Sequence, residues 1–153
     1  MKQLLIALAL ITSSLAHADG FRCTTESGLV IKVYNHTDPH EGTRKAAIMI
    51  ISDANVGLGN KTIASFITEK GVLQSKEQTY TAKVDLRFLE SSRKGELIGG
   101  TKLGFLQKII LSVNFNYDMP VKNGEKVSGL LILVKRDGER LVEAATCARY
   151  LKN

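Results

Sequence analysis

The 153-residue sequence contains no tryptophan, two prolines, two cysteines and three histidines, and aromatic residues make up only 6% of it. With two prolines and 13 glycines the chain is not collagen-like, and a hydrophobic content of 44% excludes an intrinsically disordered chain. Scarce aromatic residues also disfavour an outer-membrane β-barrel, which carries aromatic girdles at both membrane interfaces. Length and composition therefore indicate one globular domain.

The N-terminus has the pattern of a secretory signal peptide. Lys2 is followed by the apolar run Leu4–Ile11, and Ala16 and Ala18 supply small residues where a signal peptidase cuts. This run is shorter than the roughly 20 apolar residues of a membrane span, and no later segment is long enough. We therefore predict a signal peptide over 1–18 and one mature domain over 19–153. That domain is expected to be periplasmic or secreted, without a membrane span.

Export changes how the two cysteines are interpreted. Cys23 lies near the start of the predicted mature chain and Cys147 near its end. An even number of cysteines in an oxidising compartment indicates a disulfide, and neither residue belongs to a Cys-x-x-Cys motif. In the chain-entropy model, a bridge that closes so long a loop stabilises the fold by about 5 kcal/mol. We predict a structural Cys23–Cys147 disulfide that holds the ends of the domain side by side.

The mature sequence has the two-residue periodicity of antiparallel β-strands. Apolar and polar side chains alternate from Tyr80 to Phe88 and from Ile109 to Tyr117, as expected for strands buried on one face. Ala46–Ile51 and Val127–Val134 are nearly continuous apolar runs, which predict strands covered on both faces. Asp137-Gly138 predicts a hairpin with a two-residue link. The predicted strands cover residues 21–26, 28–35, 44–52, 61–68, 79–88, 96–101, 106–117, 127–136 and 139–148.

This pattern predicts an all-β fold, either a single antiparallel barrel of eight or nine strands or a closed two-sheet sandwich. In both, the disulfide joins the terminal segments. Leu141–Leu151 is rich in helix-forming residues, so a short terminal helix is an alternative there. The hairpin signal at Asp137-Gly138 favours a strand.

The sequence contains no recognisable catalytic or metal-binding constellation. His36 and His40 lie on either side of Asp38-Pro39, which disfavours the helix that would align them. Without a third distant histidine or a triad, we predict no metal site, no cofactor and no enzymatic activity, with a hydrolase that uses His36 or His40 as the alternative. Gly57–Thr62 lacks the residue order of a nucleotide-binding loop and is interpreted as a turn. Basic residues do not cluster with interleaved aromatics, so nucleic-acid binding is not expected.

The glycine-rich stretch Gly95–Gly104 is the most unusual part of the sequence. Glycines within a strand mark a bulge, a barrel corner or a close approach of two backbones, so the stretch predicts a bent strand that closes a small barrel. Alternatively, the missing side chains open a groove for a ligand. In that case nearby basic residues would form a rim that attracts an anionic group. The candidate ligand-binding residues are Arg87, Arg93, Lys94 and Lys102.

Four segments together resemble a group of small exported proteins of predatory Gram-negative bacteria. These segments are Phe21–Cys23, Val84–Phe88, Arg93–Gly104 and Cys147–Leu151. The resemblance covers most of the mature chain and implies an exported, lipocalin-like β body. No activity is established for the group, so no functional residue is carried over from it.

The expected function is that of an exported, monomeric binding module for a small apolar or anionic ligand. An alternative is a protein-binding module, such as an enzyme inhibitor that acts on an acidic partner. The net charge of +6 for the whole chain, or about +5 without Lys2, favours an acidic partner over a basic one.

Overall fold

The computed structural model describes residues 19–37, 44–53, 62–67, 73–74, 79–115 and 122–151. These residues form an all-β domain with two short 3-10 turns and no α-helix in the described ranges. The two turns are η2 (Ser91–Arg93) and η3 (Leu103–Phe105). The strands are β1 (Asp19–Thr25), β2 (Leu29–Thr37), β3 (Arg44–Asp53), β4 (Thr62–Ile67), β5 (Leu73–Gln74), β6 (Thr79–Asp85), β7 (Leu97–Ile98), β8 (Thr101–Lys102), β9 (Leu106–Asn114), β10 (Lys126–Lys135) and β11 (Arg140–Leu151).

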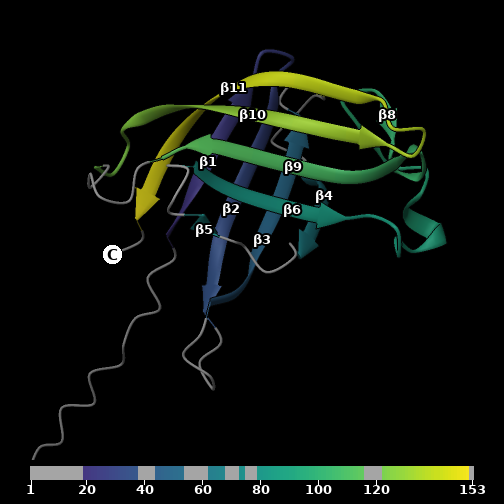
Figure 1. Cartoon of the computed structure of the whole chain (residues 1–153), viewed down its shortest axis with the longest axis horizontal. Coiled ribbons are helices and arrows are strands. Elements are labelled where there is room, and N and C mark those ends of the chain that lie inside the picture. The colour runs from purple at the N-terminus through teal and green to yellow at the C-terminus, as the bar shows by residue number, and fades with distance from the viewer. Residues whose placement is uncertain are drawn as a thin grey trace, which may run out of the picture.

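Nine of the strands form one antiparallel sheet in the order β4-β3-β2-β1-β11-β10-β9-β6-β5. The sheet curls into a half-barrel, so that β6, β9 and β10 cross over β1, β2 and β3 (Figure 1). The outermost strands of the described sheet, β4 and β5, are not paired with each other. The all-β prediction is therefore confirmed as an open, curled sheet, while a closed barrel is not shown.

The core lies between the two halves of this curled sheet. Tyr80, on β6, contacts Phe21, on β1, with ring centroids 5.1 Å apart, although three strands separate β6 from β1 in the sheet. Phe115 packs edge-on against Phe21 at 5.3 Å. Every second residue of β6, and of β9 from Ile109 on, is buried, as the alternating pattern predicts. The pattern is wrong at Phe88, which lies beyond the end of β6 and is 89% exposed. Apolar side chains from the two halves thus pack against each other in the core.

The two apolar runs, at Ala46–Ile51 and Val127–Val134, are not covered on both faces as predicted. Leu130, on β10, is 43% exposed, and Ile48, on β3, is 36% exposed. Their neighbours Leu131 and Met49 are buried, so both strands have one inner and one outer face. The prediction is wrong because we took all the apolar residues of these two runs to be buried. Single exposed aliphatic residues are common on protein surfaces.

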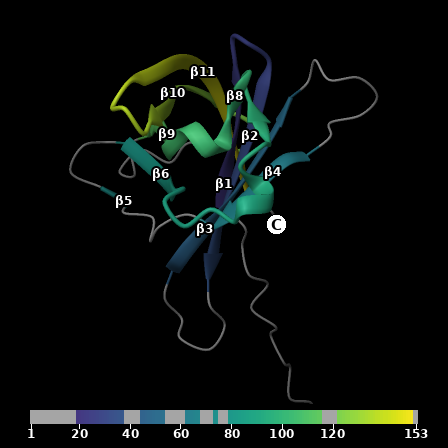
Figure 2. The same cartoon turned by 90° about the vertical axis from the view of Figure 1, so that its right-hand side faces the viewer.

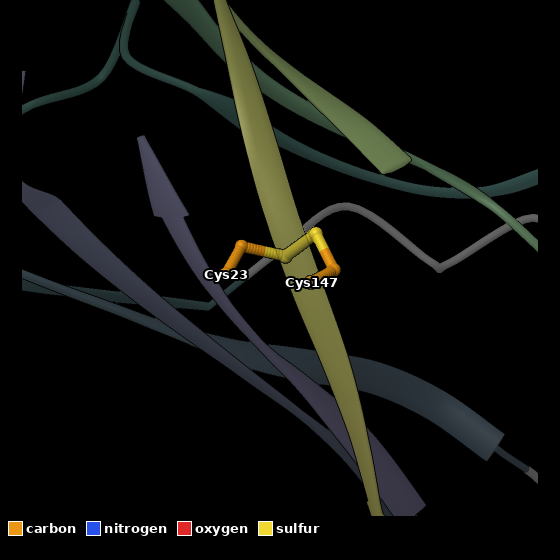
Figure 3. The surroundings of a disulfide bond; sticks show 2 residues. All are labelled: Cys23 and Cys147. Carbon is orange, nitrogen blue, oxygen red and sulfur yellow. A yellow bond between two sulfur atoms is a disulfide. The ribbon is translucent and has the colours of Figure 1, made fainter. Parts of the chain in front are cut away.

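Cys23 and Cys147 form the predicted disulfide, which joins neighbouring strands β1 and β11 (Figure 3). The two residues are directly opposite in the antiparallel register, with Cα atoms 3.9 Å apart, and both are fully buried. Gly129, on β10, provides the space for this bridge. A Cβ at Gly129 would lie only 2.7 Å from the Cys147 Sγ, closer than such atoms approach in folded proteins.

The glycine-rich stretch differs from the predicted strand over 96–101. It forms a tight hairpin in which β7 pairs with β8 around Gly99 and Gly100. The φ angles of these glycines are +54° and +78°, as a two-residue hairpin turn of the favoured type requires. The hairpin packs onto the core through Ile98, which is fully buried. The predicted bend is therefore a reversal of the chain.

The C-terminal segment is a strand, β11, as predicted, and not a helix. The hairpin between β10 and β11 is also confirmed, but its link is longer than two residues. The Lys135 amide donates to the Glu139 carbonyl at 2.8 Å, and the Gly138 amide donates to the Lys135 carbonyl at 3.0 Å. Three residues, Arg136 to Gly138, therefore form the turn, with Gly138 at a φ of +93°.

Several predictions concern residues outside the described ranges. These include the signal peptide over 1–18, most of the polar loop that follows His36, residues 57–61 of the turn predicted over Gly57–Thr62, and residues 116–117 of the strand predicted over 106–117. Thr62 itself begins β4. Within the described ranges, no helix is long and apolar enough to cross a lipid bilayer.

Candidate functional site

The candidate site is a surface groove of about 500 Å³ between the β7–β8 hairpin and the β10–β11 turn. Figure 2 views this end of the molecule. The antiparallel register brings the two segments together because Leu106, at the start of β9, pairs with Lys135, at the end of β10. Residues just before β9 therefore lie beside residues just after β10. We call this the hairpin groove; it is lined by Leu97, Gly100, Thr101, Lys102, Phe105, Lys135, Arg136 and Asp137.

Backbone hydrogen bonds hold the walls of the hairpin groove. The Leu103 amide donates to the Glu96 carbonyl at 2.8 Å, and the Gly104 amide donates to the Lys94 carbonyl at 3.0 Å. Arg136 joins the two walls, because its amide donates to the Phe105 carbonyl at 2.9 Å and its Nε donates to the Gly104 carbonyl at 2.9 Å. These contacts fix the distance between the hairpin and the turn without using the end of the Arg136 guanidinium.

Gly104 permits this packing, since a Cβ there would lie 3.1 Å from both the Cβ and the carbonyl oxygen of Lys94. Gly100 has a different role in the groove. Its absent side chain leaves open space, with no heavy atom within 4 Å of where a Cβ would stand. The predicted groove opened by missing side chains is therefore present, beside a hairpin and not beside a bent strand.

The hairpin groove combines apolar and cationic side chains with one carboxylate, Asp137, whose Oδ1 accepts a hydrogen bond from the Glu139 amide at 2.9 Å. Phe105 is 63% exposed and Leu97 is 49% exposed, which is high for large apolar residues. Lys102 and Arg136 have no carboxylate partner among the described residues. Lys135 does have one, because the Glu139 carboxylate lies 2.5 Å from its Nζ and raises its pKa. The groove therefore offers two unneutralised cations beside an exposed apolar surface.

Of the four candidate ligand-binding residues, only Lys102 lines the groove. Arg87 instead forms an ion pair with Asp85, and its guanidinium lies 5.8 Å from the Phe88 ring centre. The Arg87 hydrogen bonds lower the pKa of the Asp85 carboxyl to about 2.

Arg93 and Lys94 also lie outside the groove lining. Arg93 makes a two-pronged contact with Glu96, at 3.2 Å from Nε and 3.1 Å from the terminal nitrogen. Lys94 is exposed, and its backbone supports the groove through the contact with Gly104.

Arg136 and Phe105 are groove residues that the sequence analysis did not identify. The predicted strands could have indicated Arg136. If the strands over 106–117 and 127–136 pair as a hairpin, the start of the first strand lies beside the end of the second, so Phe105 and Arg136 come close together. Within the described ranges, no three histidine, cysteine, aspartate or glutamate side chains come together as a metal site would require.

Comparison with known proteins returned no match to a protein-family model, a curated protein or a solved structure. The functional argument therefore rests on the geometry of the chain itself.

Proposed function

We propose that the protein is an exported binding module whose hairpin groove takes a small molecule with an apolar body and an anionic group. The observation that carries this proposal is the pairing of exposed Phe105 and Leu97 with the unneutralised cations Lys102 and Arg136 around one cavity. Apolar surface with a few placed polar groups is the usual composition of a small-molecule site. A cavity of about 500 Å³ lies within the size range of such sites.

The buried disulfide supports the exported part of the proposal. Disulfides form and persist in the periplasm and outside the cell, and they are rare in the reducing cytosol. Cys23 and Cys147 are paired and fully buried. A periplasmic or secreted location, reached through a signal peptide over 1–18, is consistent with this bond.

Each end of the ligand has a defined place in the proposed complex. Its apolar part lies against Phe105 and Leu97, so that their exposed surface is removed from water. Its anionic group lies between Lys102 and Arg136, where each charge-assisted hydrogen bond contributes about 1.5–3 kcal/mol. Gly100 keeps the entrance open, because any side chain there would fill the space that the ligand needs.

A fluorescence titration with 8-anilinonaphthalene-1-sulfonate, an apolar anion, tests the proposal. We expect saturable binding that weakens at least about tenfold in Lys102→Gln/Arg136→Gln, since both charge-assisted contacts are lost. Phe105→Ser should also weaken binding. Phe88→Ser is the matched control, because Phe88 is 89% exposed but does not line the groove. Equal binding by Phe105→Ser, Phe88→Ser and the unmodified protein would refute the proposed site.

A further inference from the structure

A second groove crosses the outer face of the sheet, directly over the strands that the disulfide joins. Its volume is about 510 Å³, and its lining includes Arg22, Thr24, Glu26, Lys126, Thr146 and Ala148. We call this the outer groove. It shares no lining residue with the hairpin groove.

The register explains why two cations meet at one end of the outer groove. Ala148, on β11, pairs with Arg22 on β1 and with Lys126 on β10. Arg22 and Lys126 therefore flank a methyl group in a single cross-strand row, with Cβ atoms two strand spacings, or about 10 Å, apart. Both side chains are long enough to converge over Ala148, which is too small to separate them. Neither has a carboxylate partner among the described residues.

Hydroxyl groups occupy the next outward-facing row. Thr24 pairs with Thr146 across β1 and β11, and Ser128 follows on β10. All three residues are exposed on the outer face. A Lys32 side chain extends the cationic row on the other side of Arg22, since these residues pair between β2 and β1. An anion at this end would thus meet positive charge from three strands and hydroxyl donors from the adjacent row.

The opposite end of the outer groove carries a carboxylate. Glu26 lies four residues after Arg22, directly beyond the end of β1, in the turn that the Gly28 amide closes by donating to the Thr25 carbonyl at 3.1 Å. A carboxylate accepts hydrogen bonds from hydroxyl groups and repels a second anion. The groove is therefore polarised, with an anion end, a hydroxyl-lined middle and an acceptor end. A nucleic-acid strand fits this lining poorly, because no aromatic side chain for base stacking is among its residues.

We propose that the outer groove binds a phosphorylated or sulfated sugar. The phosphate or sulfate lies between Arg22 and Lys126, the ring hydroxyls contact Thr24 and Thr146, and a distal hydroxyl donates to Glu26. The disulfide between Cys23 and Cys147 lies on the inner side of the same strand pair. It fixes the spacing between the strand that carries Arg22 and Thr24 and the strand that carries Thr146 and Ala148.

Amide chemical-shift titrations with glucose 6-phosphate and glucose 6-sulfate test this site, with glucose and inorganic phosphate as the partial ligands. We expect saturable shifts around Thr24 and Thr146 with both anionic sugars, and weaker binding of either partial ligand. Arg22→Gln and Lys126→Gln should each raise the apparent Kd for glucose 6-phosphate roughly tenfold, the value of one charge-assisted hydrogen bond. Lys83→Gln, an exposed cation on β6, is the matched control and should leave the Kd unchanged.

The same chemistry can be presented by a soluble sugar phosphate or by a lipid headgroup. Flotation with phosphatidylcholine vesicles that carry phosphatidylinositol 4-phosphate, lost in Arg22→Gln, would assign the site to a headgroup. Saturable binding of glucose 6-phosphate without flotation would assign it to a soluble ligand. The proposal is overturned if neither occurs, if Arg22→Gln and Lys83→Gln behave alike, or if inorganic phosphate binds as tightly as glucose 6-phosphate.

Discussion

The space for the disulfide depends on one glycine, and Gly129→Ala tests this dependence. The added Cβ would stand 2.7 Å from the Cys147 Sγ and 3.0 Å from the Ser112 carbonyl oxygen. Heavy atoms in ordinary contact lie about 3.5–4.0 Å apart, so the sulfur would have to move by about 1 Å in a fully buried position. Forcing an extra methyl group into a packed core costs about 1–3 kcal/mol. We expect this loss in the free energy of unfolding, measured by urea denaturation of the oxidised protein.

Two controls separate this steric effect from a general effect of replacing glycine. Gly95→Ala should change stability by less than about 0.5 kcal/mol, because no heavy atom lies within 4 Å of the added Cβ. In a Cys23→Ala/Cys147→Ala background the Sγ is absent, so the cost of Gly129→Ala should fall by at least about 1 kcal/mol. An equal cost with and without the disulfide would refute the reasoning.

Two further predictions concern Ile98, on β7, and Asp85, at the end of β6. Ile98→Ala should lower the free energy of unfolding in urea by about 2–5 kcal/mol, because Ile98 is fully buried. A loss below about 1 kcal/mol would show that the β7–β8 hairpin is not part of the core. The pKa of the Asp85 carboxyl is about 2 in the folded state, against an ordinary value of 3.8. The ion pair with Arg87 therefore stabilises the fold above about pH 4, and this contribution is lost as the pH falls toward 2. Asp85→Asn should therefore cost about 1 kcal/mol or less at pH 7, since Arg87 is 57% exposed, and this cost should shrink as the pH falls toward 2. A constant difference across this range would contradict the assignment.

The strands were predictable because their signals are local, and the disulfide was predictable because two cysteines are expected to pair if the chain is exported. Alternation matches burial along β6 and along β9 from Ile109 on, and it fails at Phe88, beyond the end of β6. The pairing of Cys23 with Cys147 needed only the count of cysteines and the expected compartment. The hairpin at Gly99 and Gly100 was missed, although two consecutive glycines are a known signal for a two-residue turn. We interpreted residues 96–101 as a single strand because we took the residues before and after the two glycines to belong to the same strand.

The candidate binding residues were harder to predict because the positions of basic residues in the sequence do not show which of them are neutralised by a carboxylate. Arg87 and Arg93 were candidates, but each is neutralised by a nearby carboxylate, Asp85 two residues before and Glu96 three residues after. Arg136 was not a candidate because its position beside Phe105 depends on the pairing of β9 with β10. The outer groove depends on the register of three strands, which places Arg22 and Lys126 on either side of one alanine. Such cross-strand rows cannot be read from one strand at a time.

The central claim is that a ligand binds at the surface of the curled sheet, in the hairpin groove. Amide chemical-shift mapping with 8-anilinonaphthalene-1-sulfonate tests this claim most directly. The account predicts saturable shifts confined to residues 97–105 and 135–137. Shifts centred on Tyr80 and Phe21, whose rings contact each other in the core, would show that the ligand enters the interior and would contradict it.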